Sequence, residues 1–264
     1  MEHFTNYFVE GLQGAGKSTL VGALSAKLPG YKVFREGDYS PVELAWCAYV
    51  TETQYGEILA RYPKLEQEIV DKTVVEDDHR IICYTQILTD VEGFHKDLER
   101  YEIYNGNVAR DLFETIILSR YQKWNGTEQI FECSIFQNII ENQMLYLMMT
   151  DEEILDFYRK LGRVLYGRPY KIIYLDVEDI FRTIEVIRKE RSDEEGNELW
   201  FPLMVRYLED SPYGKLNSLR GMDGLLTHLG RRKKLERRII DEILKDRALV
   251  VKSKKYDLAG EMGL

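Results

Sequence analysis

Short apolar runs alternate with longer amphipathic stretches along the 264 residues of the chain. An apolar run bounded by turn residues predicts a buried strand, and apolar residues spaced three or four apart predict a helix. The pattern predicts strands at residues 7–9, 31–34, 130–134, 171–176 and 248–251. Helices are predicted over residues 19–28, 107–124, 135–149, 151–166, 180–191 and 199–247. This alternation predicts an α/β fold, with a five-stranded parallel sheet flanked by helices.

Residues 42–106 interrupt this alternation with a mostly helical pattern rich in Tyr and charged residues. Residues 70–80 and 91–100 are charged enough to predict exposed helix or connection, whereas residues 81–84 and 87–88 predict a buried patch. We therefore predict one domain over residues 1–264, with a helical insertion at about 42–106 that covers the substrate.

A glycine-rich loop follows the first predicted strand. Residues 11–18 read GLQGAGKS and match G-x-x-x-x-G-K-[ST], which defines a phosphate-binding loop and the P-loop NTPase type of α/β fold. Glycines adopt backbone angles that turn successive N–H groups toward phosphate oxygens. Lys17 brings a positive charge to the β and γ phosphates, and the Ser18 hydroxyl suits Mg²⁺. ATP and Mg²⁺ are the predicted cofactors, bound by Gly11, Gly14, Ala15, Gly16, Lys17, Ser18 and Thr19.

Three carboxylates follow or end predicted strands. Ligands of open parallel sheets gather at the carboxyl ends of the strands, so Glu36 and Asp38, after the second strand, are candidates for the base that takes a proton from an attacking hydroxyl. The alternative is a solvated turn in which Asp38 caps a helix that starts near Pro41. Glu132, at the end of the third strand, is predicted to hold Mg²⁺ directly or through water.

Basic residues gather at two places. Arg188 and Arg191 lie at the end of the helix predicted over residues 180–191, before an acidic, glycine-containing segment, and predict a lid at about residues 188–200 that stabilises charge on the transferred phosphoryl group. The alternative is that they only stabilise a helix C-terminus. The block RRKKLERR at residues 231–238 is interpreted as a solvated helix face, because acidic residues flank it.

The net charge of −9 argues against a general nucleic-acid or acidic-membrane binder. The sequence has no run of 18 apolar residues and begins with Met-Glu-His-Phe rather than a basic segment before an apolar one. We therefore expect a cytoplasmic protein with a small-molecule acceptor as its partner, and leave a homodimer open. The three cysteines share no metal-ligand or disulfide-framework spacing, and Cys47 and Cys83 are expected to be buried.

Several of these segments together resemble the deoxynucleoside kinase family, which is closely related to the thymidylate kinases. The matching segments, in chain order, are Val9-Glu10-Gly11 through Thr19, Glu36 followed by Pro41-Val42 and Trp46, Phe113-Glu114-Thr115 with Leu118-Ser119-Arg120, Phe131-Glu132-Cys133-Ser134, Tyr174-Leu175 with Arg188 to Glu195, and Tyr207-Leu208-Glu209. The resemblance implies that Glu36 is the catalytic base and that Arg188 and Arg191 belong to an arginine lid. It also implies that Glu36, Asp38, Glu114, Cys133 and Glu209 line the acceptor site.

Two departures from the family fall where the acceptor is recognised. Glu114 replaces a Gln that can donate and accept, and an ionised Glu only accepts, so it favours a group that offers two donors or a cation. Cys133 replaces an Arg near the reacting hydroxyl and removes a positive charge there. The segment between Glu36 and Phe113 is also longer than in the family, which predicts a rebuilt acceptor pocket.

The hypothesis that follows is an ATP-dependent kinase that phosphorylates a nucleoside-like or nucleotide-like acceptor. Two alternatives stay open: a phosphotransferase for an amino-bearing compound such as an antibiotic, and a regulatory ATPase without a phosphorylated product. A guanine-specific switch lacks the N-K-x-D motif, and a non-catalytic module is disfavoured by the presence of both Lys17 and Ser18.

Overall fold

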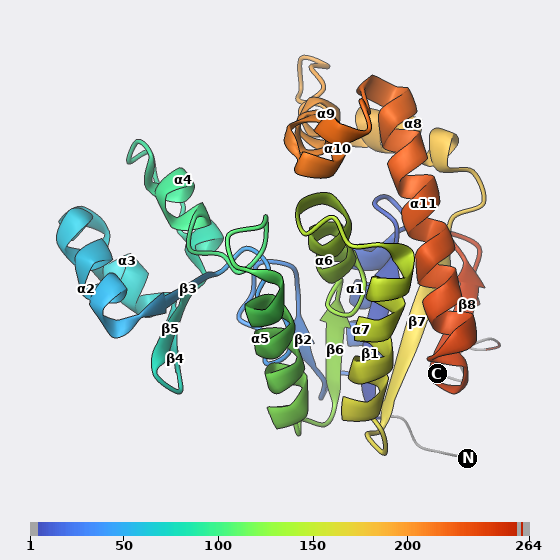
Figure 1. The fold of residues 1–264 in the computed structure, drawn as a ribbon, viewed down its shortest axis with the longest axis horizontal. Helices are drawn as coiled ribbons and strands as arrows, with labels where there is room; N and C mark the ends of the chain where they lie inside the picture. Colours follow the sequence, from blue (N-terminus) through green and yellow to red (C-terminus); the bar gives the residue numbers. More distant parts are fainter. Residues whose placement is uncertain (1–4, 258–259, 261–264) are drawn as a thin grey trace. The chain divides into compact units, whose positions relative to one another are not determined.

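The computed structural model describes residues 5–257 and residue 260, and the chain divides into two compact units. Unit 1 contains residues 1–33 and 125–264, and unit 2 contains residues 34–124. Figure 1 labels the helices and strands of both.

Unit 1 is built on a five-stranded sheet in the order β2-β6-β1-β7-β8. The strands are β1 (Asn6–Gly11), β2 (Lys32–Phe34), β6 (Gln129–Glu132), β7 (Tyr170–Asp176) and β8 (Ala248–Lys252). The central strand β1 pairs in parallel with β6 and β7, and β7 pairs in parallel with β8. The predicted α/β fold with a parallel sheet of the P-loop NTPase type is confirmed, and all five predicted strands are present.

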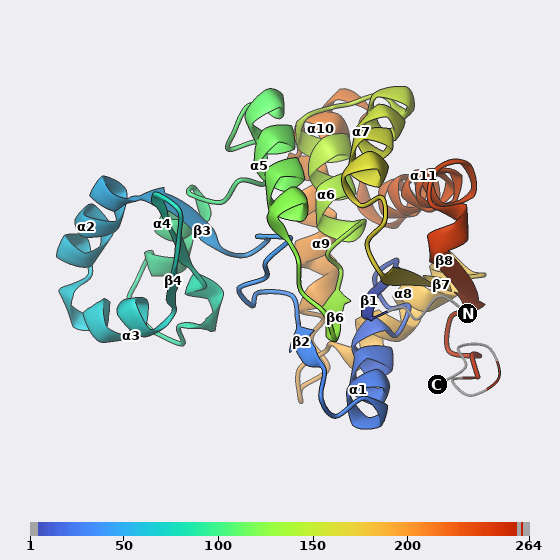
Figure 2. The same ribbon diagram turned by 90° about the horizontal axis from the view of Figure 1, so that it is seen from below.

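Helices cover both faces of this sheet. The helices of unit 1 are α1 (Lys17–Lys27), α6 (Gln137–Glu141), the π-helix η3 (Asn142–Tyr146), α7 (Asp151–Val164), α8 (Ile180–Glu190), α9 (Trp200–Asp210), α10 (Pro212–Leu216), α11 (Gly221–Glu242) and the short η4 (Lys245–Arg247). In Figure 2, α1 lies on one side of the strands, and α6, α7 and α11 lie on the other. The helix predicted over residues 135–149 is shorter and changes to a π-helix at Asn142, and residues 199–247 form several helices.

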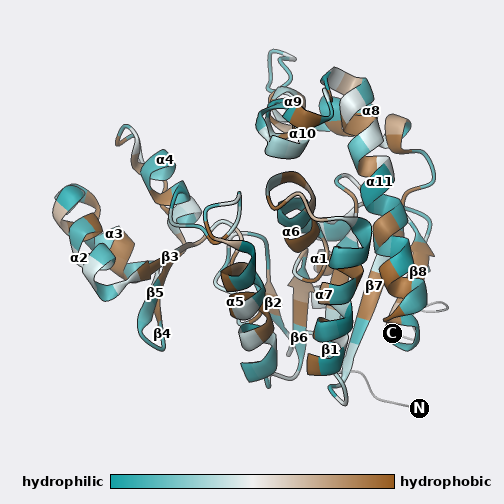
Figure 3. Cartoon of the chain, viewed as in Figure 1, coloured by the Kyte–Doolittle hydropathy of each residue, from teal (hydrophilic) through white to brown (hydrophobic). Residues whose placement is uncertain are grey.

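The core of unit 1 follows from the hydrophobic pattern. Figure 3 shows hydrophobic colour along β7 and alternating hydrophobic and hydrophilic turns along α11. Leu20 and Leu24 of α1 pack in one cluster with Leu175 of β7 and with Leu225 and Leu229 of α11. Burial of these faces, rather than helix propensity, therefore stabilises the elements. None of the helices in the described part of the chain combines the length and the apolar character needed to cross a membrane.

Unit 2 has a separate core and a separate sheet. A three-stranded antiparallel sheet in the order β3-β5-β4 joins β3 (Ala48–Thr51), β4 (Thr73–Glu76) and β5 (His79–Ile82). The helices are α2 (Glu52–Arg61), η1 (Pro63–Leu65), α3 (Glu66–Asp71), η2 (Tyr84–Gln86), α4 (Phe94–Glu99) and α5 (Arg110–Lys123). Val50, Ile58, Ile69, Ile82 and Phe94 are fully or almost fully buried in its core.

The prediction of a mostly helical insertion at 42–106 missed this sheet. Residues 70–80, expected as helix or connection, form the end of α3 and a hairpin whose strands β4 and β5 meet at a two-residue turn, Asp77-Asp78. The alternative that Asp38 caps a helix near Pro41 is also wrong, because no helix begins there. Ile81 to Tyr84 and Ile87 are buried as predicted, whereas Leu88 is 95% exposed. Cys47 and Cys83 are buried and unbridged, as expected.

The N-terminus of α7 gives a direct test of how local sequence sets an element boundary. Thr150 accepts the Glu153 N–H, and Glu153 accepts the Thr150 N–H, so a capping box is present. We expect Thr150→Ala to lower the free energy of unfolding by about 1 kcal/mol, because the Glu153 N–H loses its acceptor and the hydroxyl that donates to Glu153 is removed, while the N–H of residue 150 keeps its bond.

Urea unfolding followed by circular dichroism measures this change. Thr150→Ser is the matched control, since serine keeps the hydroxyl, and it should unfold within about 0.3 kcal/mol of the unmodified protein. Equal losses in both variants would contradict the assignment to the cap.

Candidate functional site

The loop between β1 and α1 has the glycine-dependent backbone that the sequence predicts. Gly11, Gly14 and Gly16 have φ values of 140°, 75° and 92°, which residues with side chains rarely adopt. A Cβ on Gly14 would lie 2.1 Å from Ile187 Cδ1 of α8, and one on Gly11 would lie 2.7 Å from the Leu175 carbonyl oxygen. Helix α8 and strand β7 therefore pack directly against the loop backbone.

Lys17 is held over this loop. Its Nζ donates to the carbonyls of Gly11 and Leu12, both at 2.9 Å, and only 8% of the residue is exposed. An ammonium group has three N–H donors, so two fix its position and its charge remains for an anion. The first turn of α1 carries no acidic residue, so the positive end of that helix is not offset, while Ser18 and Thr19 are exposed there.

Ser18 and Glu132 meet across neighbouring elements. The Ser18 hydroxyl donates to Glu132 Oε1 at 2.5 Å, because β1 and β6 run in parallel with Val9 opposite Glu132. The predicted pairing of a loop hydroxyl with a strand-end carboxylate is therefore present. Hydroxyl and carboxylate oxygens are the hard donors that Mg²⁺ prefers, and phosphate oxygens and water complete such a site, so the two residues fit the ion.

A buried polar network lies beneath the loop, and the sequence did not predict it. Arg232 of α11 is 0% exposed and donates to Gln13 Oε1 at 2.9 Å, to the Gly11 carbonyl at 3.3 Å, and to Glu141. Its Nε donates to Glu236 at 2.7 Å. The interpretation of residues 231–238 as a solvated face is therefore wrong for Arg232 and Glu236, because both point into the protein.

The carboxylates of this network differ in protonation. Burial by itself would raise the pKa of Glu141, but the charges of His228 and Arg232 lower it to about 2. His228 Nε2 lies 2.7 Å from Glu141. Burial raises the pKa of Glu10 to about 7, although Glu10 accepts the Ile135 N–H at 2.7 Å. Glu141 thus stays ionised as the counter-ion of Arg232, whereas Glu10 carries a proton more readily than an ordinary Glu.

Cys133 follows Glu132 directly and has an unusual backbone. Its φ is 60°, its N–H donates to the Val9 carbonyl at 3.2 Å, and it is 1% exposed. A left-handed conformation is uncommon for a residue with a side chain, so the chain turns sharply here. The Ser134 hydroxyl stabilises this turn by donating to the Glu132 carbonyl oxygen at 3.2 Å.

The predicted lid joins α8 to α9 through an isolated bridge between Ser192 and Glu198. Arg188 donates to Glu198 at 3.0 Å and to Glu185 at 2.5 Å, and its guanidinium lies 4.4 Å from the ring of Phe201. Arg191 lies 5.7 Å from the Trp200 ring. The lid arginines therefore contact lid residues in this structure.

Two further residues of unit 1 make defined contacts, Glu209 with the start of α11 and Ser253 with the loop. Glu209 accepts the Gly221 N–H at 2.9 Å and so stabilises the start of α11. Ser253, after β8, donates to the Ala15 carbonyl at 2.8 Å. The sequence did not predict Ser253 as part of this site, because a single Ser after a strand carries no motif.

Unit 2 contains the other predicted residues. Glu36 is exposed and accepts the Trp46 indole N–H at 3.1 Å, so the Glu and Trp matched by resemblance are in contact. Both carboxylate oxygens of Asp38 accept bonds within unit 2, from the Arg35 N–H at 2.8 Å and from Gln86 at 2.7 Å. Asp38 thus fixes the loop that carries Glu36.

Two carboxyl groups of unit 2, Glu114 and Glu43, are less negative than isolated carboxylates would be. Arg110 Nε donates to Glu114 Oε1 at 3.0 Å, one turn away on α5. Glu43, which the sequence did not single out, is 5% exposed, and burial with the nearby Glu36 charge raises its pKa to about 8. Glu43 is therefore mainly protonated at neutral pH, and Glu114 is neutralised by an arginine.

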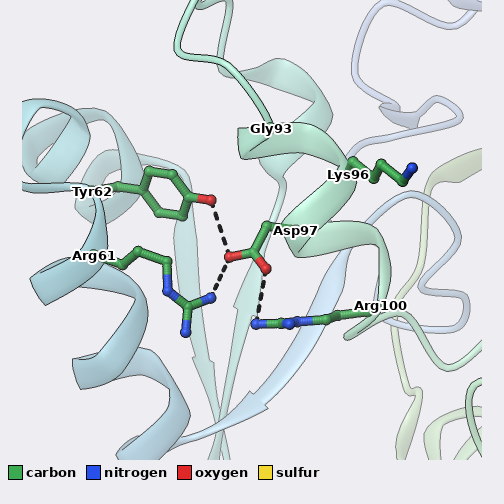
Figure 4. Close-up of a pocket in the computed structure, with 6 residues that line it drawn as sticks. All are labelled: Arg61, Tyr62, Gly93, Lys96, Asp97 and Arg100. Carbon is green, nitrogen blue, oxygen red and sulfur yellow. Dashed lines mark hydrogen bonds and ion pairs between the residues drawn. The ribbon is translucent and has the colours of Figure 1, made fainter.

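A separate open pocket of about 400 Å³ lies between α2 and α4 of unit 2. Figure 4 shows Asp97 at its centre, bonded to Arg61, Tyr62 and Arg100, with Lys96 beside them. One carboxylate, that of Asp97, already pairs with both arginines of this pocket. The residues that line the pocket do not include the glycine-rich loop of unit 1, whose N–H groups would bind a triphosphate. The candidate site remains the loop of unit 1.

Comparison with known proteins adds little to this geometry. No protein-family model matches the chain, and no curated protein matches its sequence. Among solved structures, the chain is similar to the shikimate kinase of Bacteroides thetaiotaomicron, with 13% identity and a TM-score of 0.28, over 95% of this chain and 86% of that one. A similarity this low carries no information about activity.

Proposed function

We propose that this protein is an ATP-dependent small-molecule kinase that transfers the γ-phosphoryl group to a hydroxyl or phosphate of a nucleoside-like or nucleotide-like acceptor. The observation that carries the proposal is the 2.5 Å contact between Ser18 and Glu132 beside the loop that holds Lys17. That contact supports a site for Mg²⁺ and a triphosphate, since it brings the required oxygens together at the carboxyl edge of the sheet.

The residues have distinct roles in the proposed reaction. The loop N–H groups and Lys17 bind the phosphates, and Ser18 and Glu132 hold Mg²⁺, which offsets the charge of the phosphate oxygens when bound. Glu36 accepts the proton of the acceptor hydroxyl as its oxygen bonds to the γ-phosphorus. The bond from that phosphorus to the ADP oxygen breaks, and Arg188 and Arg191 stabilise the charge that develops.

The base is assigned to Glu36 rather than Asp38 because of their contacts. Both oxygens of Asp38 are engaged by Arg35 and Gln86, which is the role of a loop-fixing residue. Glu36 accepts the Trp46 indole N–H at 3.1 Å through Oε1, and the residue is exposed on unit 2, where a hydroxyl can reach it.

The state of Glu114 supports a nucleoside-like or nucleotide-like acceptor over an amino-bearing compound. An ionised Glu without a counter-ion would favour a cationic acceptor, but Arg110 supplies that charge at 3.0 Å. The pair presents donor and acceptor groups on one turn of α5, the chemistry that reads the edge of a nucleobase.

The first test identifies the acceptor and the base together. ATP consumption is screened against nucleosides, nucleotides and amino-bearing natural products, with mass spectrometry of the product. With the acceptor found, Glu36→Gln should lower kcat by about 10²- to 10⁴-fold, because proton transfer from the hydroxyl is lost, and should leave the Kd of Mg·ATP within about twofold.

Asp38→Asn is the comparison variant and should lose less than about tenfold in kcat, since the amide oxygen can still accept the Arg35 N–H, although it cannot also accept from Gln86. Near-normal turnover of Glu36→Gln would remove the base assignment. ATP hydrolysis stimulated by a protein, with no phosphorylated product, would favour the regulatory ATPase instead.

A second test concerns Mg²⁺. Glu132→Gln replaces a charged oxygen ligand with a neutral amide and should weaken Mg·ATP binding by about 10- to 100-fold. Calorimetric titration measures this, and ATP titrated with EDTA is the internal control, because its affinity should be the same for both proteins. An equal loss in EDTA would show that Glu132 acts on the loop rather than on the ion.

A third test uses two glycines of adjoining segments. Gly14→Ala forces a side chain toward Ile187 at φ 75° and should weaken Mg·ATP binding by about 100-fold. Gly22→Ala, in the exposed middle of α1 with no atom within 4 Å, should keep the affinity and raise the free energy of unfolding by about 0.5–1 kcal/mol. Normal affinity in Gly14→Ala would contradict the loop geometry.

A further inference from the structure

The roles proposed above do not explain why Arg232 contacts the phosphate loop. It comes from α11, more than 200 residues after the loop, yet it reaches the Gly11 carbonyl at 3.3 Å and Gln13 at 2.9 Å. A fully buried arginine is costly to desolvate unless carboxylates and acceptors surround it. Glu141 and Glu236 supply the two carboxylates, and the loop supplies the other acceptors.

Arg232 makes two kinds of contact: ion pairs with buried carboxylates, and hydrogen bonds to the loop. Glu236 is fixed by the Tyr174 hydroxyl at 2.7 Å, and Glu141 by His228 at 2.7 Å, so β7 and α11 set the position of the guanidinium. The two remaining contacts are the hydrogen bonds from Arg232 to the loop, at Gln13 and at the Gly11 carbonyl. The planar guanidinium can make all of these bonds at once, whereas an ammonium donates from a single point.

The Gly11 carbonyl is shared by two cationic groups. Lys17 Nζ donates to it at 2.9 Å and Arg232 Nη2 at 3.3 Å. The orientation of this carbonyl fixes the peptide that links Gly11 to Leu12, and with it the start of the loop. Two donors from different elements hold that peptide more firmly than Lys17 alone, which also has to serve a ligand.

We propose that Arg232 is a positioning residue for the phosphate loop: through Gln13 and the Gly11 carbonyl, it keeps the loop N–H groups ordered for a phosphate ligand. The proposal rests on the proposed function for the identity of the ligand, but the ordering itself is a property of the ligand-free protein. In this proposal Arg232 acts through the loop, and its contacts are with Gln13, the Gly11 carbonyl, Glu141 and Glu236.

The experiment removes the contact of Arg232 with Gln13 and leaves the ion pairs of Arg232 with Glu141 and Glu236 in place. The long contact of Gln13 Nε2 with Glu141 Oε1, at 3.5 Å, is lost with it. Gln13→Leu keeps the size of the side chain but cannot accept from Arg232, and Gln13 is only partly buried, so the fold is retained. Amide hydrogen exchange of peptides that cover residues 10–18, measured without nucleotide, should become about tenfold faster, and the Kd of Mg·ATP should rise about tenfold.

Arg232→Lys supplies the second side of a double-mutant cycle. If Arg232 acts through Gln13, Gln13→Leu in the Arg232→Lys background changes loop exchange by less than about twofold. The matched control is Arg231→Gln, the preceding residue, which pairs with Asp151 on the other side of the helix turn and should leave loop exchange unchanged.

The two readouts separate the proposals. Failure of the unmodified protein to bind Mg·ATP would overturn the proposed function, while the exchange measurement would still test Arg232. Unchanged loop exchange in Gln13→Leu, or an equal acceleration in both backgrounds, would overturn the positioning role. If Arg232→Lys does not fold, the result for Gln13→Leu alone decides, because that variant leaves the buried ion pairs in place.

Discussion

The absence of a side chain at position 14 is the constraint on which the arrangement of unit 1 depends. Thr183 and Ile187 of α8 pack against Gly14 so closely that a Cβ would overlap the Ile187 side chain. The last turn of the same helix carries Arg188, so the close packing also determines how far the first lid arginine lies from the loop. A backbone requirement of one residue thus fixes the position of a helix almost 170 residues later in the chain.

The parts of this site that sequence reasoning predicted are those whose chemistry needs adjacent residues or strand ends. The loop is contiguous, and its glycines have the positive φ angles that the motif demands. The contact of Ser18 with Glu132 follows from parallel pairing of β1 with β6, which brings strand ends to one edge. The roles given to Glu36, Glu114, Cys133, Arg188, Arg191 and Glu209 remain predictions.

Other features were missed for identifiable physical reasons. Arg232 lies in a run of basic residues, and the run concealed its place on the stripe of Leu225, Leu229 and Ile239, whose helical spacing marks a buried face. The hairpin of β4 and β5 had a local sequence signal, namely two turn residues, Asp77-Asp78, between a Val-rich and an Ile-rich run. In the structure Asp77 adopts φ 52° in this turn. The π-helix at Asn142 has no comparable signal, because its hydrogen bonds depend on packing.

The Arg188 guanidinium is already paired with Glu185 and Glu198, so an anion from solution has to compete with these carboxylates to bind it. These carboxylates are partly exposed, so a polyanion that offers several oxygens at once can replace them, whereas a singly charged ion competes poorly. Glu185 and Glu198 would thereby set a minimum ligand charge for binding to Arg188. Inorganic salts and monophosphates would leave Arg188 paired with these two carboxylates.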